Sequence, residues 1–415
     1  MKLPPFAAAA LAGLLVFGIL TDWVPSRWPL SLIQGGVFLL ALAWLVGFVR
    51  DPQPVRTCWL LWPLAGALLW GLLQLTLYST ESRFETWEAV LSLLTALALF
   101  FLASQLLASA ETRRAFRRFL AGFGFLLSIV STLQLATSGG KVFWIFATQF
   151  RSDVAGPFLN RDHFASLMVL LLPLALWETL KEKRRPALWG VMAAVMFASV
   201  MAAASRAGAL LVTAEVAWFL LPFAWRSRPA DRPVRTVALR FALTAMLAIT
   251  LAGGEVLWRR FRDPDPFGGR RQIWSAAWEM GRQRPGLGFG LGAWPLVYPA
   301  YATADFGTRM VVNHAHNDWL EWAAEGGLPF ALLMLAPAVG SVWLALRTPW
   351  GLGVVAVFVH SLVDFPLQKP SLAYLLMVLL AAMAAAQPAK QAAVTSEARP
   401  ARPMRCAVPL PAANL

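Results

Sequence analysis

The chain has 415 residues, of which 58% are hydrophobic and only 14% are charged, and its mean hydropathy is +0.60. A soluble domain of this length needs more polar surface, so the composition excludes that class and indicates a polytopic α-helical membrane protein. The net charge of +14 does not indicate a nucleic-acid partner. Most basic residues occur in short segments between apolar runs, as they do in membrane proteins.

Neither the N-terminal segment nor the cysteines indicate a secreted protein. The apolar run that ends at Leu20 resembles a signal peptide, but it has no small-x-small cleavage site before Thr21. We therefore expect it to form the first membrane helix. Cys58 and Cys406 lie far apart at positions expected to be cytoplasmic, which argues against a disulfide framework and against a thiolate metal site.

Apolar runs of membrane length follow one another along the chain. They begin near Phe6, Leu30, Cys58, Glu88, Phe119, His163, Ala187, Gly208, Val237, Leu320, Trp350 and Ser371. Because about 20 residues cross the hydrocarbon core, we expect an all-α fold with about 12 transmembrane helices. A long loop, from about Gly253 to Gly327, separates the ninth helix from the tenth and holds eight arginines and six tryptophans.

The basic residues indicate how the bundle is oriented. With the N-terminus in the cytoplasm, sixteen Lys and Arg residues fall in loops on the cytoplasmic side. Seven fall on the opposite side when the long loop is left out. By the positive-inside rule, both ends of the chain are then cytoplasmic and the long loop is external.

This orientation brings the polar segments to the external side. They are GPFLNRDHFAS (Gly156 to Ser166), SRAG (Ser205 to Gly208), the long loop, and HSLVDFPLQKP (His360 to Pro370). All four histidines of the chain are among them. We therefore expect four segments that are distant in sequence to converge on one external cavity.

An amphipathic helix is predicted inside the long loop. Ile273, Trp274, Ala277, Trp278 and Gly281 recur at helical spacing, and Pro285-Gly286 ends the pattern. Such a helix lies on the membrane surface with its tryptophans at the headgroup level, or packs on top of the bundle. The GLGFGLG that follows lacks the spacing of a nucleotide fingerprint and no strand precedes it, so we interpret it as a pliable connector.

Three arginines are candidates for binding phosphate. Arg270 and Arg271 open the amphipathic helix, and Arg206 follows a run of small residues at a helix boundary. The guanidinium group offers a fixed fork of donors that fits phosphate oxygens and cannot be neutralised. Most outward arginines are only solvated. A Ser-Arg pair between two nearly uncharged helices is harder to explain in that way, which favours Arg206.

The HAHND segment, with His314, His316 and Asp318, allows three interpretations. A histidine is a ready base near neutral pH. An H-x-H pair can also bind metal, but no further His or Cys cluster completes a coordination shell. A capping or packing role is the third, with Asn317 as the predicted N-cap of the next helix. We favour the base and expect no metal and no cofactor.

These motifs together resemble the O-antigen ligase and polymerase superfamily. The resemblance covers about Gly156 to Pro370 and rests on GPFLNRDHFA, SRAG, GRRQIW, RPGLGFG, HAHNDWLEWAAEGGLP and HSLVDFPLQ. It implies a bacterial inner-membrane enzyme with about 12 helices and a large periplasmic loop between the ninth and tenth. Such enzymes pass a glycan from undecaprenyl pyrophosphate to an acceptor, without metal.

The resemblance also implies roles for individual residues. Arg206 matches the arginine of the S-R-G motif, with Ala207 inserted, and Arg270 that of G-R-x-x-I-W. His316 matches the histidine of the H-N motif, the proposed catalytic base. The expected substrate-binding residues are Arg271, His314, Asn317, Arg161, His163 and Asn160. Two positions depart from the family: Asp162 replaces an asparagine of N-R-N-H, and Phe330 stands where a small residue is common.

On this basis the chain divides into N-terminal transmembrane helices (1–155), a catalytic region (156–387) that contains the loop 253–327, and a disordered cytoplasmic tail (388–415) rich in Ala and Pro. The implied reaction is an inverting displacement. His316 deprotonates the acceptor hydroxyl, while Arg206 and Arg270 stabilise the departing pyrophosphate.

Several functions share this chemistry and remain open. The acceptor is the lipid A-core for a ligase, another lipid-linked repeat unit for a polymerase, and a protein for an O-oligosaccharyltransferase. A polysaccharide transporter is the alternative from another class, because transporters carry ionisable residues in the middle of the membrane. Glu215 is the one residue that fits that description.

Overall fold

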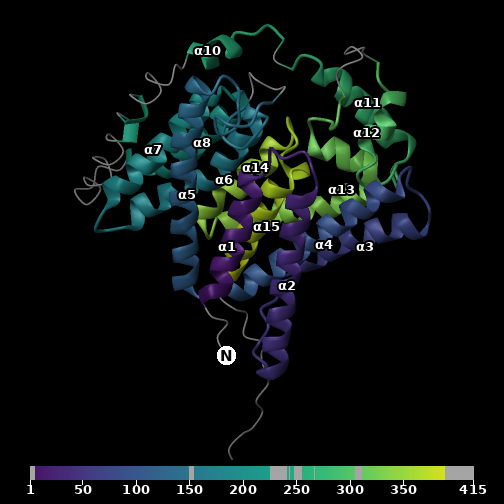
Figure 1. Cartoon of the computed structure of the whole chain (residues 1–415), viewed down its shortest axis with the longest axis horizontal. Helices are drawn as coiled ribbons and strands as arrows, with labels where there is room; N and C mark the ends of the chain where they lie inside the picture. Colours follow the sequence, from purple (N-terminus) through teal and green to yellow (C-terminus); the bar gives the residue numbers. More distant parts are fainter. Residues whose placement is uncertain are drawn as a thin grey trace, which may run out of the picture.

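The computed structural model describes residues 5–148, 154–224, 241–242, 244–246, 255–265, 267–303 and 311–387. Within these ranges the chain is helical, and β-type pairing is limited to two isolated bridges, Val142 with Phe146 and Ala155 with Phe158. The expected all-α fold is thus confirmed (Figure 1). The tail 388–415, with Cys406, lies outside the described residues.

The apolar runs of the sequence form the helices of the structure. The first half holds α1 (Pro5–Leu20), α2 (Trp28–Arg50), α3 (Leu61–Thr76), α4 (Arg83–Leu106), α5 (Ala110–Thr137), α6 (Arg161–Lys181), α7 (Pro186–Ala203) and α8 (Arg206–Ala224). The second half holds α10 (Glu255–Phe261), α11 (Arg270–Gln283), α12 (Trp294–Val297), η2 (Tyr298–Ala300), α13 (Asp318–Ala345), η3 (Pro349–Gly351), α14 (Leu352–His360), η4 (Pro366–Gln368) and α15 (Pro370–Ala385). The run expected to begin near Val237 starts outside the described residues.

The described helices make this a multi-pass membrane protein. Six of them, α2, α4, α5, α6, α7 and α13, are long and apolar enough to cross a membrane. Four shorter apolar helices of the described chain, α1, α3, α15 and the η3–α14 segment, add to them. The expected number of 12 crossings stays a prediction.

The centre of the bundle is α6. In its most apolar window 89% of the residues are buried, against 17% for α2. A helix that is apolar on all sides must be surrounded by other helices, and α6 contacts α5, α7, α8 and α14. The peripheral α2 instead exposes Leu39, Leu42 and Val49. Side chains of this kind are suited to contact with lipid.

One end of the bundle carries a cluster of basic residues. Arg117 and Arg118 near the start of α5 contact the carboxylate of Glu178, near the end of α6, at 3.1 and 2.8 Å. Arg113 donates to the carbonyl of Ala385, at the end of α15. The start of α5 and the ends of α6 and α15 therefore lie together, as the alternation of basic loops predicts.

The predicted polar segments lie at the other end. Here α6, α13 and α15 begin and α1 ends, as the hydrogen bond from Ser371 to Asp22 shows (2.6 Å). In Figure 1 the helices of the long loop, α10, α11 and α12, lie at the top of the view, whereas α2 extends to the bottom. The candidate site is built at this end.

The first two turns of α13 are separated from the rest by a break at Gly327, where φ is +70° and ψ is −179°. A Cβ atom at this position would lie 2.2 Å from the carbonyl oxygen of Gly286. The break lets the Leu328 N–H donate to the carbonyl of Pro285 (2.9 Å). Glycine is needed here because other residues do not adopt this conformation.

The GLGFGLG segment packs into this break, so the expectation of a pliable connector was wrong. The N–H of Phe289 donates to Ala324 and that of Gly290 to Glu325, at 3.0 and 2.8 Å. Gln74 of α3 donates to the carbonyls of Leu287 and Glu325. Its glycines permit close backbone contact rather than motion, and they fix the long loop to α3 and α13.

The amphipathic helix is present as α11, and it packs on α13. Its buried residues are Ile273, Ala276, Ala277 and Met280, whereas Trp278 is exposed. The sequence left open whether this helix lies on the membrane surface or packs on top of the bundle. The burial of Ile273 and Ala277 shows that this face packs on protein.

Candidate active site

The start of α6 supplies two side chains to the site. Asn160 is the N-cap, and its side-chain oxygen accepts a hydrogen bond from the Asp162 N–H (2.8 Å). This cap and the acidic residue in the first turn are the usual start of a helix. The cap fixes Asp162 and the buried His163 at the polar end of the bundle.

His316 is held in a left-handed backbone conformation, with φ at +51°. For a non-glycine residue this costs of order 1–3 kcal/mol and persists only where surrounding contacts enforce it. The Trp274 indole donates to its carbonyl (3.2 Å). The next residue, Asn317, caps α13 by accepting from Leu320, as predicted, and its amide donates to Leu362. Strain of this kind is common at functional sites.

The partner of His316 is a buried carboxylate, Asp364, which lies between α14 and η4. Its Oδ1 is 3.2 Å from Nδ1 of His316, and its Oδ2 is 3.9 Å from Nε2 of His163. Arg270 lies 3.9 Å from Oδ1. The sequence interpretation included this residue in a motif but gave it no role. The available signal was a carboxylate in an apolar stretch, four residues after His360.

The surroundings of Asp364 keep it ionised. Burial on its own would raise the pKa of this carboxyl, but the hydrogen bond with His316 and the positive charge of Arg270, beside His163 and His360, bring the pKa below its ordinary value. An ionised Asp364 can only accept a hydrogen bond, so Nδ1 of His316 is the donor. The lone pair of the neutral imidazole is then on Nε2.

Arg270, the first residue of α11, is anchored beside this pair. Its guanidinium group donates to the Val363 carbonyl (2.6 Å) and to Oδ2 of Asp162 (3.2 Å). The side chain remains 27% exposed, so part of the fork is available to a ligand. Asp162, the residue that departs from the family pattern, thus orients the arginine predicted to be catalytic.

The phenyl ring of Phe365 fills the space among three histidines. The centroid of its ring lies 4.4 Å from that of His314 and 4.7 Å from those of His163 and His316. His314 directs Nδ1 to Glu321 (2.8 Å), whereas His316 directs Nδ1 to Asp364. The two histidines of the H-x-H pair therefore contact different carboxylates.

Arg206 lies at the start of α8, next to α10. It donates to the carbonyl of Arg260 (3.2 Å), and the Arg260 guanidinium donates to the carbonyl of Ala204 (2.9 Å). Arg161 is close enough to Arg260 for their charges to repel each other. Arg161 thus lies near Arg260, which contacts Arg206, and Asp162 binds Arg270. These first two residues of α6 link the region of Arg206 with that of Arg270.

Comparison with protein families identifies this part of the chain. Residues 191–335 match the family model described as O-antigen ligase. This match supports the resemblance to the O-antigen ligase and polymerase superfamily that the motifs indicate. No curated protein matches the chain. The matched region contains Arg206, Arg270 and His316, whereas Asp162, His163 and Asp364 lie outside it and join the site through the fold.

The remaining residues predicted to bind substrate occupy other positions. Arg271 points away from the cluster: its side chain is 65% exposed, lies 3.8 Å from Asp265 and covers the ring of Phe267. Asn160 and Asn317 cap helices. The polar cluster thus consists of His316, Arg270, His163 and His314, with the carboxylates of Asp162, Glu321 and Asp364. Among the residues that the structure describes, no group of three or more His, Cys, Asp or Glu is arranged to hold a metal ion.

Proposed function

We propose that the protein is a glycosyltransferase of the bacterial inner membrane. In this proposal it moves a glycan from undecaprenyl pyrophosphate to an acceptor hydroxyl on the periplasmic side. The observation that carries it is the hydrogen bond between Nδ1 of His316 and the buried, ionised Asp364, with Arg270 fixed beside the same carboxylate. A base oriented by a carboxylate and a phosphate-binding arginine are the two parts that this transfer needs.

In the proposed reaction Nε2 of His316 takes the proton of the acceptor hydroxyl. The hydroxyl oxygen attacks the anomeric carbon from the face opposite the pyrophosphate. The bond from that carbon to the phosphate oxygen breaks, its electron pair stays on the pyrophosphate, and the anomeric configuration inverts. Asp364 stabilises the imidazolium that forms, as the carboxylate of a catalytic triad does.

The arginines act on the leaving group. Pyrophosphate is a good leaving group once its negative charge is matched, so no general acid and no pair of carboxylates of the glycosidase kind is needed. Arg270 is held by Asp162 and Val363 and keeps donors free for a phosphate oxygen. Arg206, at the start of α8, stabilises the same negative charge on the departing pyrophosphate.

The acceptor remains the open part of the proposal. A ligase that acts on the lipid A-core, a repeat-unit polymerase and a protein O-oligosaccharyltransferase would use the same base and arginines. A transport function has less support. Glu215 is buried in α8, whereas the described cluster of histidines, arginines and carboxylates lies at one end of the bundle.

Purified protein with a lipid-linked glycan donor and acceptors of each class provides the test. We expect transfer in excess chelator, because the two histidines of H-x-H are directed at different carboxylates. The product should have the opposite anomeric configuration to the donor. A retained configuration, or activity that returns only with a divalent ion, would contradict the mechanism. Absence of transfer with every acceptor class would contradict the function itself.

A further inference from the structure

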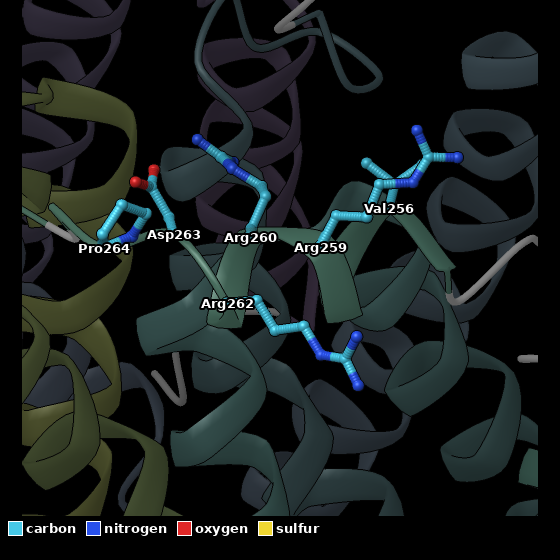
Figure 2. A pocket seen from close by; sticks show the side chains of 6 residues that line it. All are labelled: Val256, Arg259, Arg260, Arg262, Asp263 and Pro264. Atoms are coloured by element: carbon cyan, nitrogen blue, oxygen red, sulfur yellow. The ribbon is translucent and has the colours of Figure 1, made fainter.

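A cavity on α10 and the buried carboxylate of Asp318 have no part in the proposed reaction. The cavity has a volume of about 440 Å³ and is lined by Val256, Arg259, Arg260, Arg262, Asp263 and Pro264. Its three arginine side chains point in different directions in Figure 2, so they do not converge on one ligand. Asp318, by contrast, contacts the segment that carries Asp364.

Asp318, the first residue of α13, holds the segment from Ser361 to Leu367 at both of its ends. The backbone N–H of Asp318 donates to the carbonyl of Ser361 (2.9 Å) and, at 3.3 Å, to that of Asp364. The side-chain Oδ2 of Asp318 accepts a hydrogen bond from the N–H of Leu367 (3.1 Å). One residue therefore binds this segment before and after the carboxylate that faces His316.

Two more residues bind the same segment through its carbonyl groups. The Asn317 amide donates to Leu362 (2.8 Å), and the Arg270 guanidinium group donates to Val363 (2.6 Å). Both of these contacts lie ahead of Asp364 in the chain. The bond between the Asp318 side chain and Leu367 is made on the other side, so it fixes the segment where Asn317 and Arg270 do not.

The histidine and its carboxylate are in this way attached to the same short stretch of chain. Asn317 alone separates His316 from Asp318, and the backbone of His316 is held in the left-handed conformation. A shift of the segment relative to Asp318 would change the 3.2 Å contact between Nδ1 of His316 and Oδ1 of Asp364. Misplacement of catalytic groups by about 1 Å can lower a rate roughly 10²-fold.

The burial of Asp318 disfavours the folded state. The residue is 0% exposed, and its second oxygen, Oδ1, accepts no hydrogen bond within the described chain. The carboxylates of Glu321 and Asp364 are also close enough to repel its charge. Costs of this kind are typical of functional sites rather than of residues that only pack.

We propose that Asp318 is a positioning residue for the pair of His316 and Asp364. Its hydrogen bond with Leu367 holds Asp364 where the carboxylate fixes the tautomer of His316 and stabilises the imidazolium. The side chain is enclosed by protein, so Asp318 acts through Asp364 and does not touch a substrate. The consequence for turnover rests on the proposed function, in which His316 is the base, whereas the effect on the pair does not.

The test reads the protonation of His316 in the full-length protein in nanodiscs. Diethyl pyrocarbonate modifies the neutral imidazole, and mass spectrometry gives the rate at His316 as the pH is raised. The side chain is 29% exposed, so the reagent can reach it. In Asp364→Asn the imidazolium loses its carboxylate, and the pH of half-maximal rate should fall. Asp318→Ala should move this midpoint in the same direction, because Asp364 is no longer held beside His316.

Two further variants separate positioning from charge and from packing. Asp318→Asn keeps an oxygen for the Leu367 N–H and removes the negative charge, so its midpoint should stay near that of the wild type. A midpoint as low as that of Asp318→Ala would show that charge is what acts, and would overturn the proposal. Glu325→Ala is the control for packing, because this buried carboxylate of α13 also accepts a backbone N–H from another segment, that of Trp294 (2.8 Å). It should lower the unfolding temperature and leave the midpoint unchanged.

A double variant shows whether Asp318 acts through Asp364. Asp318→Ala combined with Asp364→Asn should have the midpoint of Asp364→Asn alone. His163 and Arg270, which also face Asp364, are the same in every variant. A wild-type midpoint in Asp318→Ala, or a further fall in the double variant, would show the proposal to be wrong. If Asp318→Ala does not fold, Asp318→Ser decides the outcome, because serine is too short to reach Leu367.

Turnover provides the second measurement. Asp318→Ala should lower it about tenfold or more with little change in donor affinity, and Asp318→Asn should restore it. A lowered midpoint in Asp318→Ala of a protein that transfers no glycan would support the positioning role and reject the function. A wild-type midpoint in the same variant of an active transferase would reject the positioning role and leave the function intact.

Discussion

At the scale of single residues, the proposed chemistry depends on the pair of His316 and Asp364. If Nε2 is the base, His316→Ala should lower turnover roughly 10²–10⁴-fold, the usual worth of a positioned base. Asp364→Asn should cause a loss of similar order, because the imidazole loses the carboxylate that fixes its tautomer. The double variant should be little worse than His316→Ala, since the two residues act as one unit.

Steady-state turnover and donor affinity, measured separately, check this prediction. Donor affinity should change little in both variants, and Glu279→Gln, at an exposed position on α11, should behave like the wild type. The wild-type pH profile should rise across the range in which an imidazole titrates. If Asp364→Asn keeps full turnover, Asp364 does not orient the base. If His316→Ala weakens donor binding and the rising limb persists, another base must be sought, with His163 first.

Asp364 should also make stability depend on pH. Its pKa in the folded protein is below the ordinary value of 3.8, so the carboxylate stabilises the folded state above that pH. This contribution is lost as the pH falls from about 4 toward the folded-state pKa. Unfolding temperatures in detergent between pH 6 and pH 3 should therefore fall less steeply for Asp364→Asn than for the wild type. Parallel curves would exclude Asp364 as a source of the acid sensitivity.

At the scale of elements, the break in α13 joins the long loop to the bundle. Gly327→Ala should destabilise the protein by about 1–3 kcal/mol or more, because alanine does not adopt this conformation and its Cβ would meet the Gly286 carbonyl. Gly122→Ala, in α5 with nothing within 4 Å of the added Cβ, should be neutral or slightly stabilising. Thermal unfolding of the two variants makes the comparison. Equal midpoints would show that the break is not needed.

At the scale of the whole molecule, we predict that the polar end of the bundle faces the periplasm and the basic end faces the cytoplasm. In a chain with Cys58 and Cys406 replaced by serine, Glu279→Cys on α11 should react with an impermeant maleimide in spheroplasts. Arg114→Cys at the basic end of α5 should react only after the membrane is opened. Arg114 is exposed and the Glu279 side chain is 39% exposed, so access depends on the side of the membrane. The reverse pattern would place the site in the cytoplasm.

The sequence by itself determined the helices and the polar segments, because both depend on local composition. The spacing of apolar residues predicted α11, and the HAHND segment predicted the cap at Asn317. The distribution of basic residues predicted that the polar segments gather at one end, and the motifs indicated a resemblance to the superfamily. The pairing of His316 with Asp364 and of Arg270 with Asp162 joins residues 48 and 108 positions apart. No local pattern specifies such contacts. The packing of α6, α11, α13 and α14 brings these side chains together. Tertiary contacts also hold the GLGFGLG segment against the break in α13.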